Sequence, residues 1–321
     1  MAARVLSAGA ATRFLYFCIM EKKTPLRIST ISELHAMLQL PKPMHPLISL
    51  ADNCQMNAGA EMLDHPFFLN FYKISYKYSS TGRIGYGQGY YDFNEGGMMF
   101  TAPNQLIYAD PGAKYSGYTL MFHPDFIMNY PLGRTIKKYG FFSYETNEAL
   151  HLSEREKKVI LGLFGNIGEE LNTSIDEISQ DVLVSYLEVL LNYSNRFYKR
   201  QFITRKAVNN DVLARIEQLL EAYFDDAKAL TNGLPTVEYL ASQVNLSPRY
   251  LSDMLRALTG QNSQQLIHEK LIEKAKEKLS STDLSVSEIA YELGFEHPQS
   301  FSKLFKTKTQ LSPLEYRHSF N

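Results

Sequence analysis

The chain has 321 residues, of which 45% are hydrophobic and 21% charged, the composition of an ordinary water-soluble protein with room for two domains. Its two cysteines, Cys18 and Cys54, are too few for a disulfide framework or a zinc site, so a reducing cytoplasmic compartment is expected. The formal net charge of −1 gives no overall sign of a nucleic-acid partner, and such a partner would have to be recognised by a local basic surface.

The start of the chain differs in composition from the rest. Residues 1–20 contain Arg4 and Arg13, no acidic residue and only short apolar runs. Because Arg13 interrupts the apolar stretch, the segment suits neither a signal peptide nor a membrane span. We expect residues 1–21 to be a disordered or non-native extension, followed by a domain over residues 22–205.

A short helix is expected near the start of this domain. Ser29 stands where an N-cap belongs, and Leu34, Met37 and Leu38 follow at helical spacing. Three prolines, at positions 41, 43 and 46, then favour an extended chain into residues 47–50.

The region from residue 66 to residue 122 has the pattern of β-structure. Apolar and polar residues alternate in it, and turn-forming residues recur about every ten positions. Short strands of this kind are typical of a small sandwich or barrel. The expected strands are 68–78, 84–91, 98–102 and 117–122, with a turn at 79–82.

Tyrosines crowd this β-region, and each combines an apolar ring with a polar hydroxyl. A barrel interior lined with such side chains suits a small organic ligand. Simple filling of the core by the same rings explains the pattern equally well. The residues expected to line a ligand pocket are Tyr76, Tyr86, Tyr90 and Met99.

Two amphipathic helices are expected between residues 153 and 203. Ser153 and Glu156 have the spacing of a capping box, and two apolar stripes follow. By themselves the stripes indicate an ordinary pair of core helices. The segment from 193 to 210, rich in Arg, Lys and Asn, is expected to be a linker.

The last 110 residues contain an internal repeat. Residues 237–259 and 286–309 each have an apolar helix pattern, a turn position and a second helix pattern. Asn245 and Gly294 occupy the turns, and both residue types accept a left-handed conformation. Two helices joined in this way indicate a helix-turn-helix unit. A long helix over residues 263–280 is expected to connect the two units within a domain that covers 209–321.

The region of the repeat is not basic overall. Residues 211–321 contain 12 Lys and Arg against 15 Asp and Glu, so DNA binding depends on basic residues gathered on one face. The second helices of the units, expected at 248–258 and 298–306, carry Arg249, Arg256, Lys303 and Lys306 there. A rigid connecting helix would hold these helices about 34 Å apart, one turn of DNA.

The end of the chain resembles the DNA-binding domain of the AraC/XylS family of transcription regulators. The resemblance rests on the repeat and on the run Gly-Phe-Glu, Ser-Phe-Ser-Lys-Leu-Phe-Lys and Ser-Pro-Leu-Glu-Tyr-Arg between residues 294 and 317. A weaker likeness, over residues 95–105 and 120–126, is to the cupin-type sensor domain of the same family. The resemblance implies an α+β protein with a cupin-like N-terminal barrel and a helix pair, and an all-α C-terminal domain.

The resemblance also implies which residues meet DNA. Arg249 is suited to guanine and Gln299 to adenine. Asp253 departs from the basic residue usual in the family, and either accepts from cytosine or orients Arg249 or Arg256. Gln310 replaces the usual glycine after the last recognition helix, which questions the geometry of that turn. The expected DNA-binding residues are Arg249, Ser252, Asp253, Arg256, His297, Gln299, Ser302, Lys303 and Lys306.

The sequence provides no support for catalysis. The eight histidines include no His-x-His pair of the kind that metal-binding cupin enzymes use, and no nucleophile elbow or phosphate loop is present. We expect no enzyme activity and no metal or other cofactor.

The expected function is that of a cytoplasmic, sequence-specific transcription activator. It binds promoter DNA and RNA polymerase, responds to a small molecule, forms a homodimer and makes no membrane contact. The alternatives are an N-terminal domain that only dimerises, or a cupin-type enzyme fused to a DNA-binding domain.

Overall fold

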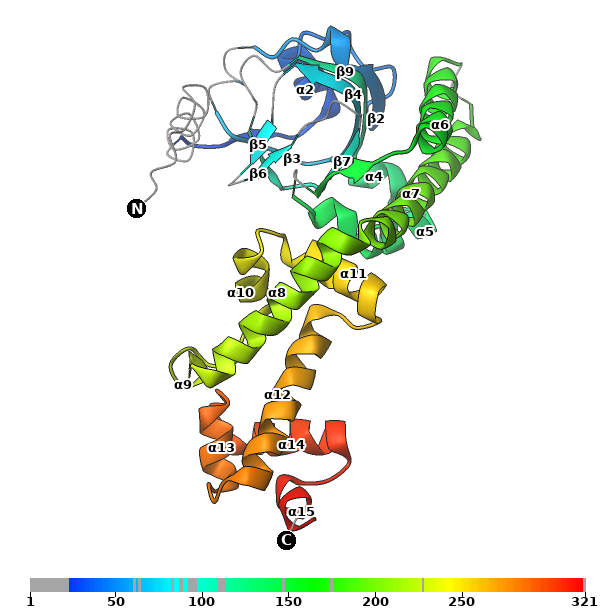
Figure 1. Ribbon diagram of the computed structural model, residues 1–321. Coiled ribbons are helices and arrows are strands. Elements are labelled where there is room, and N and C mark those ends of the chain that lie inside the picture. The colour runs from blue at the N-terminus through cyan, green and yellow to red at the C-terminus, as the bar shows by residue number, and fades with distance from the viewer. Residues whose placement is uncertain are drawn as a thin grey trace. The chain divides into compact units, whose positions relative to one another are not determined.

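A computed structural model describes residues 23–59, 62, 65–81, 84–86, 89–91, 97–108, 114–145, 148–173, 176–226 and 228–319. The expected extension over residues 1–21 therefore lies outside the described residues. The chain divides between Gln201 and Phe202 into two compact units (Figure 1). The N-terminal unit contains the sheets and the C-terminal unit is helical, so the expected α+β organisation is confirmed.

The N-terminal unit is built on a five-stranded antiparallel sheet with strand order β10-β7-β4-β9-β2. A three-stranded sheet, β1-β3-β8, and a two-stranded hairpin, β5-β6, accompany it. The strands are β1 (Leu26–Ile28), β2 (Ile48–Asp52), β3 (Phe67–Leu69), β4 (Tyr72–Thr81), β5 (Ile84–Tyr86), β6 (Gly89–Tyr91), β7 (Gly97–Thr101), β8 (Leu106–Ile107), β9 (Lys114–Phe122) and β10 (Leu150–His151).

Both faces of the five-stranded sheet are covered (Figure 1). On one face Tyr118 stacks against Phe164 of α6 (Glu154–Asn172), with ring centroids 6.2 Å apart. On the other face Met121 joins a buried cluster with Ile31 and Leu34 of α2 (Ile31–Met37) and with residues of β1 and β3. We call this second face the inner face. Because both faces are packed, the alternating pattern of β4 does not mark a solvent-exposed side.

Three local expectations in this unit were wrong. Thr30, rather than Ser29, caps α2 by accepting from the amide of Glu33, while the amide of Ser29 donates to the Glu33 carboxylate. Residues 79–81 continue β4 beside β9 instead of forming a turn. The single strand expected over 84–91 is a hairpin, in which Tyr86 pairs with Gly89. The expected cupin-like closure of the sheets into a barrel stays a prediction.

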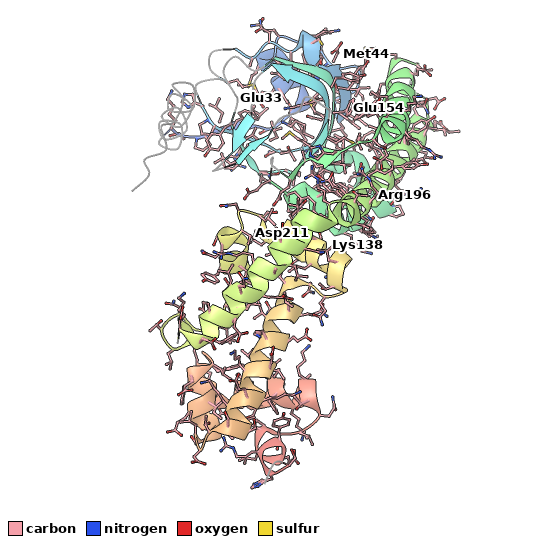
Figure 2. All side chains as sticks on the ribbon, in the orientation of Figure 1. Glu33, Met44, Lys138, Glu154, Arg196 and Asp211 are labelled. Atoms are coloured by element: carbon pink, nitrogen blue, oxygen red, sulfur yellow. The ribbon has the colours of Figure 1, made fainter. Side chains whose placement is uncertain are left out.

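Helices complete the N-terminal unit. The capping box of Ser153 and Glu156 at the start of α6 is present as expected, and Figure 2 labels Glu154 in the first turn of that helix. The expected linker over 193–210 is wrong, because α7 continues through Thr204 and α8 begins at Lys206. The remaining elements are η1 (Asn53–Gln55), α4 (Pro124–Ile127), α5 (Pro131–Thr135), η2 (Ile136–Lys138), η3 (Gly140–Ser143) and α7 (Ser179–Thr204).

The C-terminal unit holds two small helical groups joined by one long helix, α12 (Figure 1). A cluster of buried aromatic and aliphatic side chains, including Phe301, Phe305 and Ile289, forms the core of its second half. The helices are α8 (Lys206–Asp225), α9 (Lys228–Asn232), α10 (Val237–Gln243), α11 (Pro248–Thr259), α12 (Ser263–Ser281), α13 (Val286–Glu292), α14 (Pro298–Thr309) and α15 (Pro313–His318).

Candidate nucleic-acid interface

Each half of the C-terminal unit contains two helices joined by a left-handed turn residue. Asn245, between α10 and α11, has φ 56°, and Gly294, between α13 and α14, has φ 91°. The left-handed conformation expected at both positions is confirmed. The second turn contains one more residue than the first, because residues 244–247 separate the first pair of helices and residues 293–297 the second.

Gly294 is required by a close backbone approach as well as by its φ. A Cβ atom at this position would lie 2.7 Å from the carbonyl carbon of Gly233 and 3.0 Å from the carbonyl oxygen of Ala229. Both distances are shorter than ordinary van der Waals contact, and both involve backbone. The turn of the second unit is therefore packed directly on the loop that follows α9.

The recognition helices α11 and α14 end in the same way. Gly260 follows α11 with φ 79°, and Gln310 follows α14 with φ 65°. The amide of each donates to the carbonyl four residues earlier, at Arg256 and Lys306 respectively. Gln310 thus makes the turn that a glycine makes in the first unit, and its replacement of glycine does not alter the geometry.

The outer face of α14 is polar and basic. Gln299, Lys303 and Lys306 are exposed and recur at i, i+4 and i+7, so they form one stripe along the helix, while Phe301 and Phe305 are fully buried on the opposite side. His297 is exposed at the N-cap and makes no side-chain capping bond. The helix contains no acidic residue, so its exposed face is suited to a phosphate-lined groove.

The matching face of α11 carries an ion-paired group. The Arg249 Nε donates to the Asp253 Oδ2 at 3.0 Å, and the Arg256 Nη1 lies 3.7 Å from the Asp253 Oδ1. The Asp253 side chain is only 18% exposed, whereas those of Arg249 and Arg256 are 45% and 54% exposed. This arrangement matches the alternative in which Asp253 orients the arginines, because both of its oxygens face them.

Ser252 lies away from this stripe. Its hydroxyl is 2.9 Å from that of Ser263 at the start of α12, and Ser263 is fully buried. Ser302 is partly buried at the equivalent place in α14. Of the expected base-reading residues, Arg249, Gln299 and Lys303 therefore lie on the exposed stripes. Asp253 lies partly buried between Arg249 and Arg256, whereas Ser252 bonds to the connecting helix.

An ion-pair group holds α12 against α8. The Lys274 Nζ lies 2.8 Å from the Asp225 carboxylate and 2.6 Å from that of Glu221, and Lys270 also pairs with Glu221. Burial by itself would lower the pKa of Lys274, but the hydrogen bonds to Asp225 and Glu221 outweigh it and raise that pKa. Lys274 therefore stays charged, and the helix that spaces the two recognition helices is fixed at its middle.

The expected ligand residues of the N-terminal unit do not share one surface. The register of β4 and β7 pairs Tyr76 with Met98 and Ser75 with Met99, so Tyr76 and Met99 lie on opposite faces of the sheet. Tyr76 is 1% exposed, and burial, together with Tyr78 and Glu154, raises its pKa to about 12. Tyr86 and Tyr90 lie in β5 and β6, but their side chains are outside the described residues.

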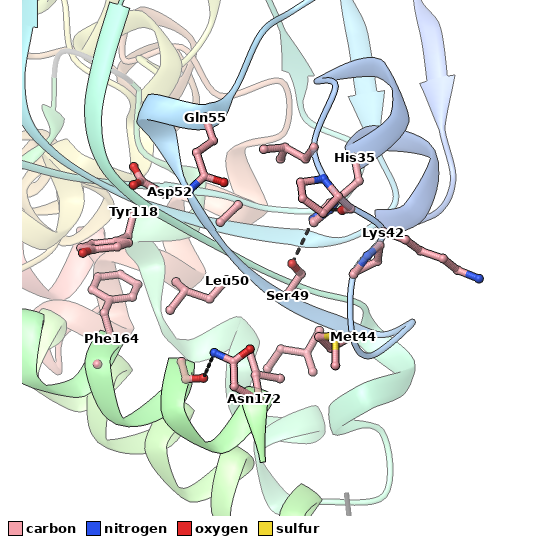
Figure 3. Close-up of a pocket in the computed structure, with 18 of the residues that line it drawn as sticks. His35, Lys42, Met44, Ser49, Leu50, Asp52, Gln55, Tyr118, Phe164 and Asn172 are labelled. Atoms are coloured by element: carbon pink, nitrogen blue, oxygen red, sulfur yellow. Dashed lines mark hydrogen bonds between the residues drawn. The ribbon is translucent and has the colours of Figure 1, made fainter. Parts of the chain in front are cut away.

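A groove between β2 and α6 was not predicted from the sequence (Figure 3). It has a volume of about 660 Å³. Space for it exists because a Cβ at Gly165 would meet no atom within 4 Å. The nearest sequence signal is the pair of glycines at 165 and 168 in an amphipathic helix. Its lining includes His35, Lys42, Met44, Asp52, Tyr78, Tyr118, Phe164 and Asn172.

Neither a membrane span nor a metal centre is found in the described part of the chain. None of the helices there is long and apolar enough to cross a membrane. Among the same described residues, no group of three or more His, Cys, Asp or Glu side chains is placed to hold a metal ion.

Comparison with known proteins gives matches to helix-turn-helix proteins. A family model described as a helix-turn-helix domain matches residues 240–319. The HTH-type transcriptional activator RhaS of Citrobacter koseri is 33% identical over 152 residues, which are 47% of this chain and 50% of RhaS. The chain thus spans about half the length of the curated relatives that it matches.

Solved structures also match. The C-terminal domain of the response regulator yesN from Fusobacterium nucleatum is 32% identical, over 33% of this chain and 98% of that domain, with a TM-score of 0.30. A transcriptional regulator of the AraC type from Chromobacterium violaceum is 22% identical, over 36% of this chain and 96% of that one, with a TM-score of 0.31. The paired helix-turn-helix units and their connecting helix thus lie in a part of the chain that matches a helix-turn-helix domain, and the chain is similar in sequence to the transcriptional activator RhaS.

Proposed function

We propose that the protein is a sequence-specific transcription activator that binds promoter DNA through α11 and α14 and responds to a small molecule through its N-terminal unit. The observation that carries this proposal is the duplicated exposed stripe. Arg249, Asp253 and Arg256 on α11 and the three stripe residues of α14 occupy equivalent positions on two equivalently built recognition helices. One connecting helix between them suits two adjacent major grooves on one face of DNA.

The two helices are proposed to read bases differently. Arg249 is held in one orientation by Asp253, which favours a bidentate contact with the O6 and N7 of guanine. Gln299 has the donor and acceptor that match the N6 and N7 of adenine. Lys303 has no anchored geometry of this kind and is proposed to contact either guanine or phosphate, while Lys306 and His297 contact the backbone.

The remaining partners belong to the same proposal. A regulator of this kind acts on RNA polymerase, and a homodimer would present two DNA-binding units to a pair of sites. The cytoplasm is the proposed location. RhaS is named as a transcriptional activator, which favours a regulator over an enzyme.

Base reading is tested by single substitutions in the full chain. Gln299→Ala and Lys303→Ala should each weaken binding to the selected site by about 1–3 kcal/mol for each base that the side chain reads. Binding to random DNA should barely change for Gln299→Ala. Lys228→Ala is the control, because Lys228 is an exposed lysine of α9 outside both recognition helices. Equal weakening on selected and random DNA would remove Gln299 from the base-reading set.

A second candidate function is a regulator whose N-terminal unit only dimerises. Genome-wide DNA binding, measured with and without candidate metabolites, separates the two. A change in occupancy with one metabolite supports a sensor, whereas occupancy that follows only protein concentration supports a constitutive dimer.

A further inference from the structure

The end of α8 is joined to the middle of α12 by ion pairs. Glu221 and Asp225 stand four residues apart and so share one face of α8, and Lys270 and Lys274 share a face of α12 in the same way. The Lys274 Nζ lies within 3 Å of both carboxylates of α8, and Lys270 also contacts Glu221. The Lys274 side chain is only 11% exposed, so water replaces little of what the two carboxylates supply.

Tyr223, which lies between the two acidic residues in the sequence, contacts both helix-turn-helix units. It is buried in the core cluster of the second unit, together with Ile289 and Phe301. Its ring also packs edge-to-face on Tyr239 of α10, in the first unit, with ring centroids 5.2 Å apart. One side chain of α8 therefore connects a helix of the first unit with the core of the second.

The hydroxyl of Tyr223 extends this connection to the backbone. It donates to the carbonyl oxygen of Gly233 at 3.0 Å. Gly233 is the residue that the turn of the second unit approaches most closely at Gly294, and the chain leads from Gly233 directly into α10 at Val237. The two units thus touch through α8 and the loop at Gly233, in addition to being joined by α12.

A second connection changes what the spacing of the units depends on. The connecting helix α12 has 19 residues and is about 28 Å long. Long helices of this kind bend, so α12 alone would leave the two ends free to tilt and twist relative to each other. The contacts of Lys274 and Tyr223 lie beside the axis of α12, and for this reason they oppose such movements.

We propose that Lys274 and Tyr223 are positioning residues, which hold α11 and α14 at one spacing and so make the protein selective for the number of base pairs between the two groups of bases that these helices read. This inference rests on the proposed function, in which α11 and α14 both read bases. Each added base pair moves one group by about 3.4 Å along the DNA and turns it by about 35°. A rigidly spaced pair of helices does not follow that change.

The test measures how strongly the full chain discriminates between spacings. Sites are selected from random DNA with the parent, and the bases read by each helix are located by the preferences that Arg249→Ala and Gln299→Ala relax. One base pair is then inserted or removed between the two groups. The parent should bind these altered sites about tenfold more weakly, because one helix loses its base contacts. Lys274→Met and Tyr223→Phe should each reduce this penalty to about threefold, since a less rigid pair of units adapts to either spacing.

A matched control and a charge exchange separate positioning from general stability. Lys278→Met removes a similar ion pair, 2.7 Å long, between α12 and Glu292 of α13 within the second unit, and should keep the full spacing penalty. Lys274→Glu should reduce the penalty, and the addition of Asp225→Lys should restore it, because opposite charges again face each other. If Lys274→Met weakens binding equally at every spacing, or leaves the penalty unchanged, the proposal is overturned.

A second variant covers a loss of stability in Lys274→Met. Glu221→Gln combined with Asp225→Asn removes the same ion pairs from side chains that are 43% and 56% exposed, so the buried core is not altered. It should show the same reduced spacing penalty, and a full penalty would contradict the proposal. A parent that selects bases but accepts every spacing would overturn this inference and leave base reading intact. A parent that selects no bases would refute the proposed function itself, and the inference with it.

Discussion

Gly294→Ala tests how closely the second helix-turn-helix unit packs on the loop after α9. The added methyl group meets two penalties. The left-handed φ of 91° costs an L-residue about 1–2 kcal/mol. The Cβ would also lie 2.7 Å from the backbone of Gly233, and overpacking of this kind costs about 1–3 kcal/mol. Alanine also lowers the conformational entropy of the unfolded chain, which offsets about 0.4–1 kcal/mol of this destabilisation. The expected net destabilisation is roughly 2–4 kcal/mol.

Gly260→Ala is the matched control. Gly260 has a similar φ of 79°, but a Cβ there would meet no atom within 4 Å. Only the conformational cost remains, so the expected destabilisation is about 1 kcal/mol or less. The difference between the two variants therefore measures the close approach to Gly233.

Hydrogen exchange of the full chain is the assay. Peptides from α13 and α14 report the local free energy of opening for Gly294→Ala, and peptides from α11 report it for Gly260→Ala. Equal destabilisation in the two variants would refute the close backbone approach at Gly294, because the conformational cost alone would then explain both.

Three further predictions follow from other positions. Gln310→Gly should stabilise the C-terminal unit by about 0.5–1 kcal/mol in urea unfolding, because it relieves the strain of a left-handed backbone, with φ 65°, at a position where the first unit has a glycine. A drop in stability would show that the contacts of the Gln310 side chain outweigh this strain. Asp253→Asn should strengthen binding to random DNA, steepen the salt dependence of that binding by about one charge and reduce discrimination for guanine. Competition binding at several salt concentrations measures all three effects. Unchanged discrimination for guanine would mean that Asp253 does not position Arg249. The pKa of Lys73 is about 8 in the folded chain and has an ordinary value of 10.5, so the unfolded chain binds more protons between these pH values. The parent should therefore gain stability relative to Lys73→Met as the pH rises from 8 to 10.5, by at most about 3 kcal/mol. Parallel curves of stability against pH for the two proteins would contradict the lowered pKa.

Much of the C-terminal unit was determined by local sequence. Asn245 and Gly294 were recognisable as turn residues because few residue types accept a left-handed conformation. The capping box of Ser285 and Glu288 fixed the start of α13, since both of its hydrogen bonds form within one turn. The repeat then identified the second unit from the first, and the exposed stripe of α14 followed from helical spacing.

Local sequence patterns did not predict the features that depend on strand pairing. Alternation over residues 84–91 is the same for one strand and for a hairpin, and only the pairing of Tyr86 with Gly89 shows the reversal. Tyr76 and Met99 seemed able to line one pocket until the register of β4 and β7 placed them on opposite faces. A shift of register by one residue would exchange these faces, and nothing within a single strand fixes it.

Tertiary structure alone also decided the environment of the charged groups. A period of two marks the two faces of β4 but does not say that both are covered, so Lys73 resembled a solvent-facing residue in the sequence. Packing of α2 and the three-stranded sheet on the inner face leaves Lys73 only partly exposed, and the loss of solvation lowers its pKa. Likewise, Ser252 has the sequence position of a base-reading residue, but the start of α12 supplies Ser263 as its partner. Local sequence determined which residues form each helix and turn, and the contacts between distant segments determined which side chains remain available to a ligand or to DNA.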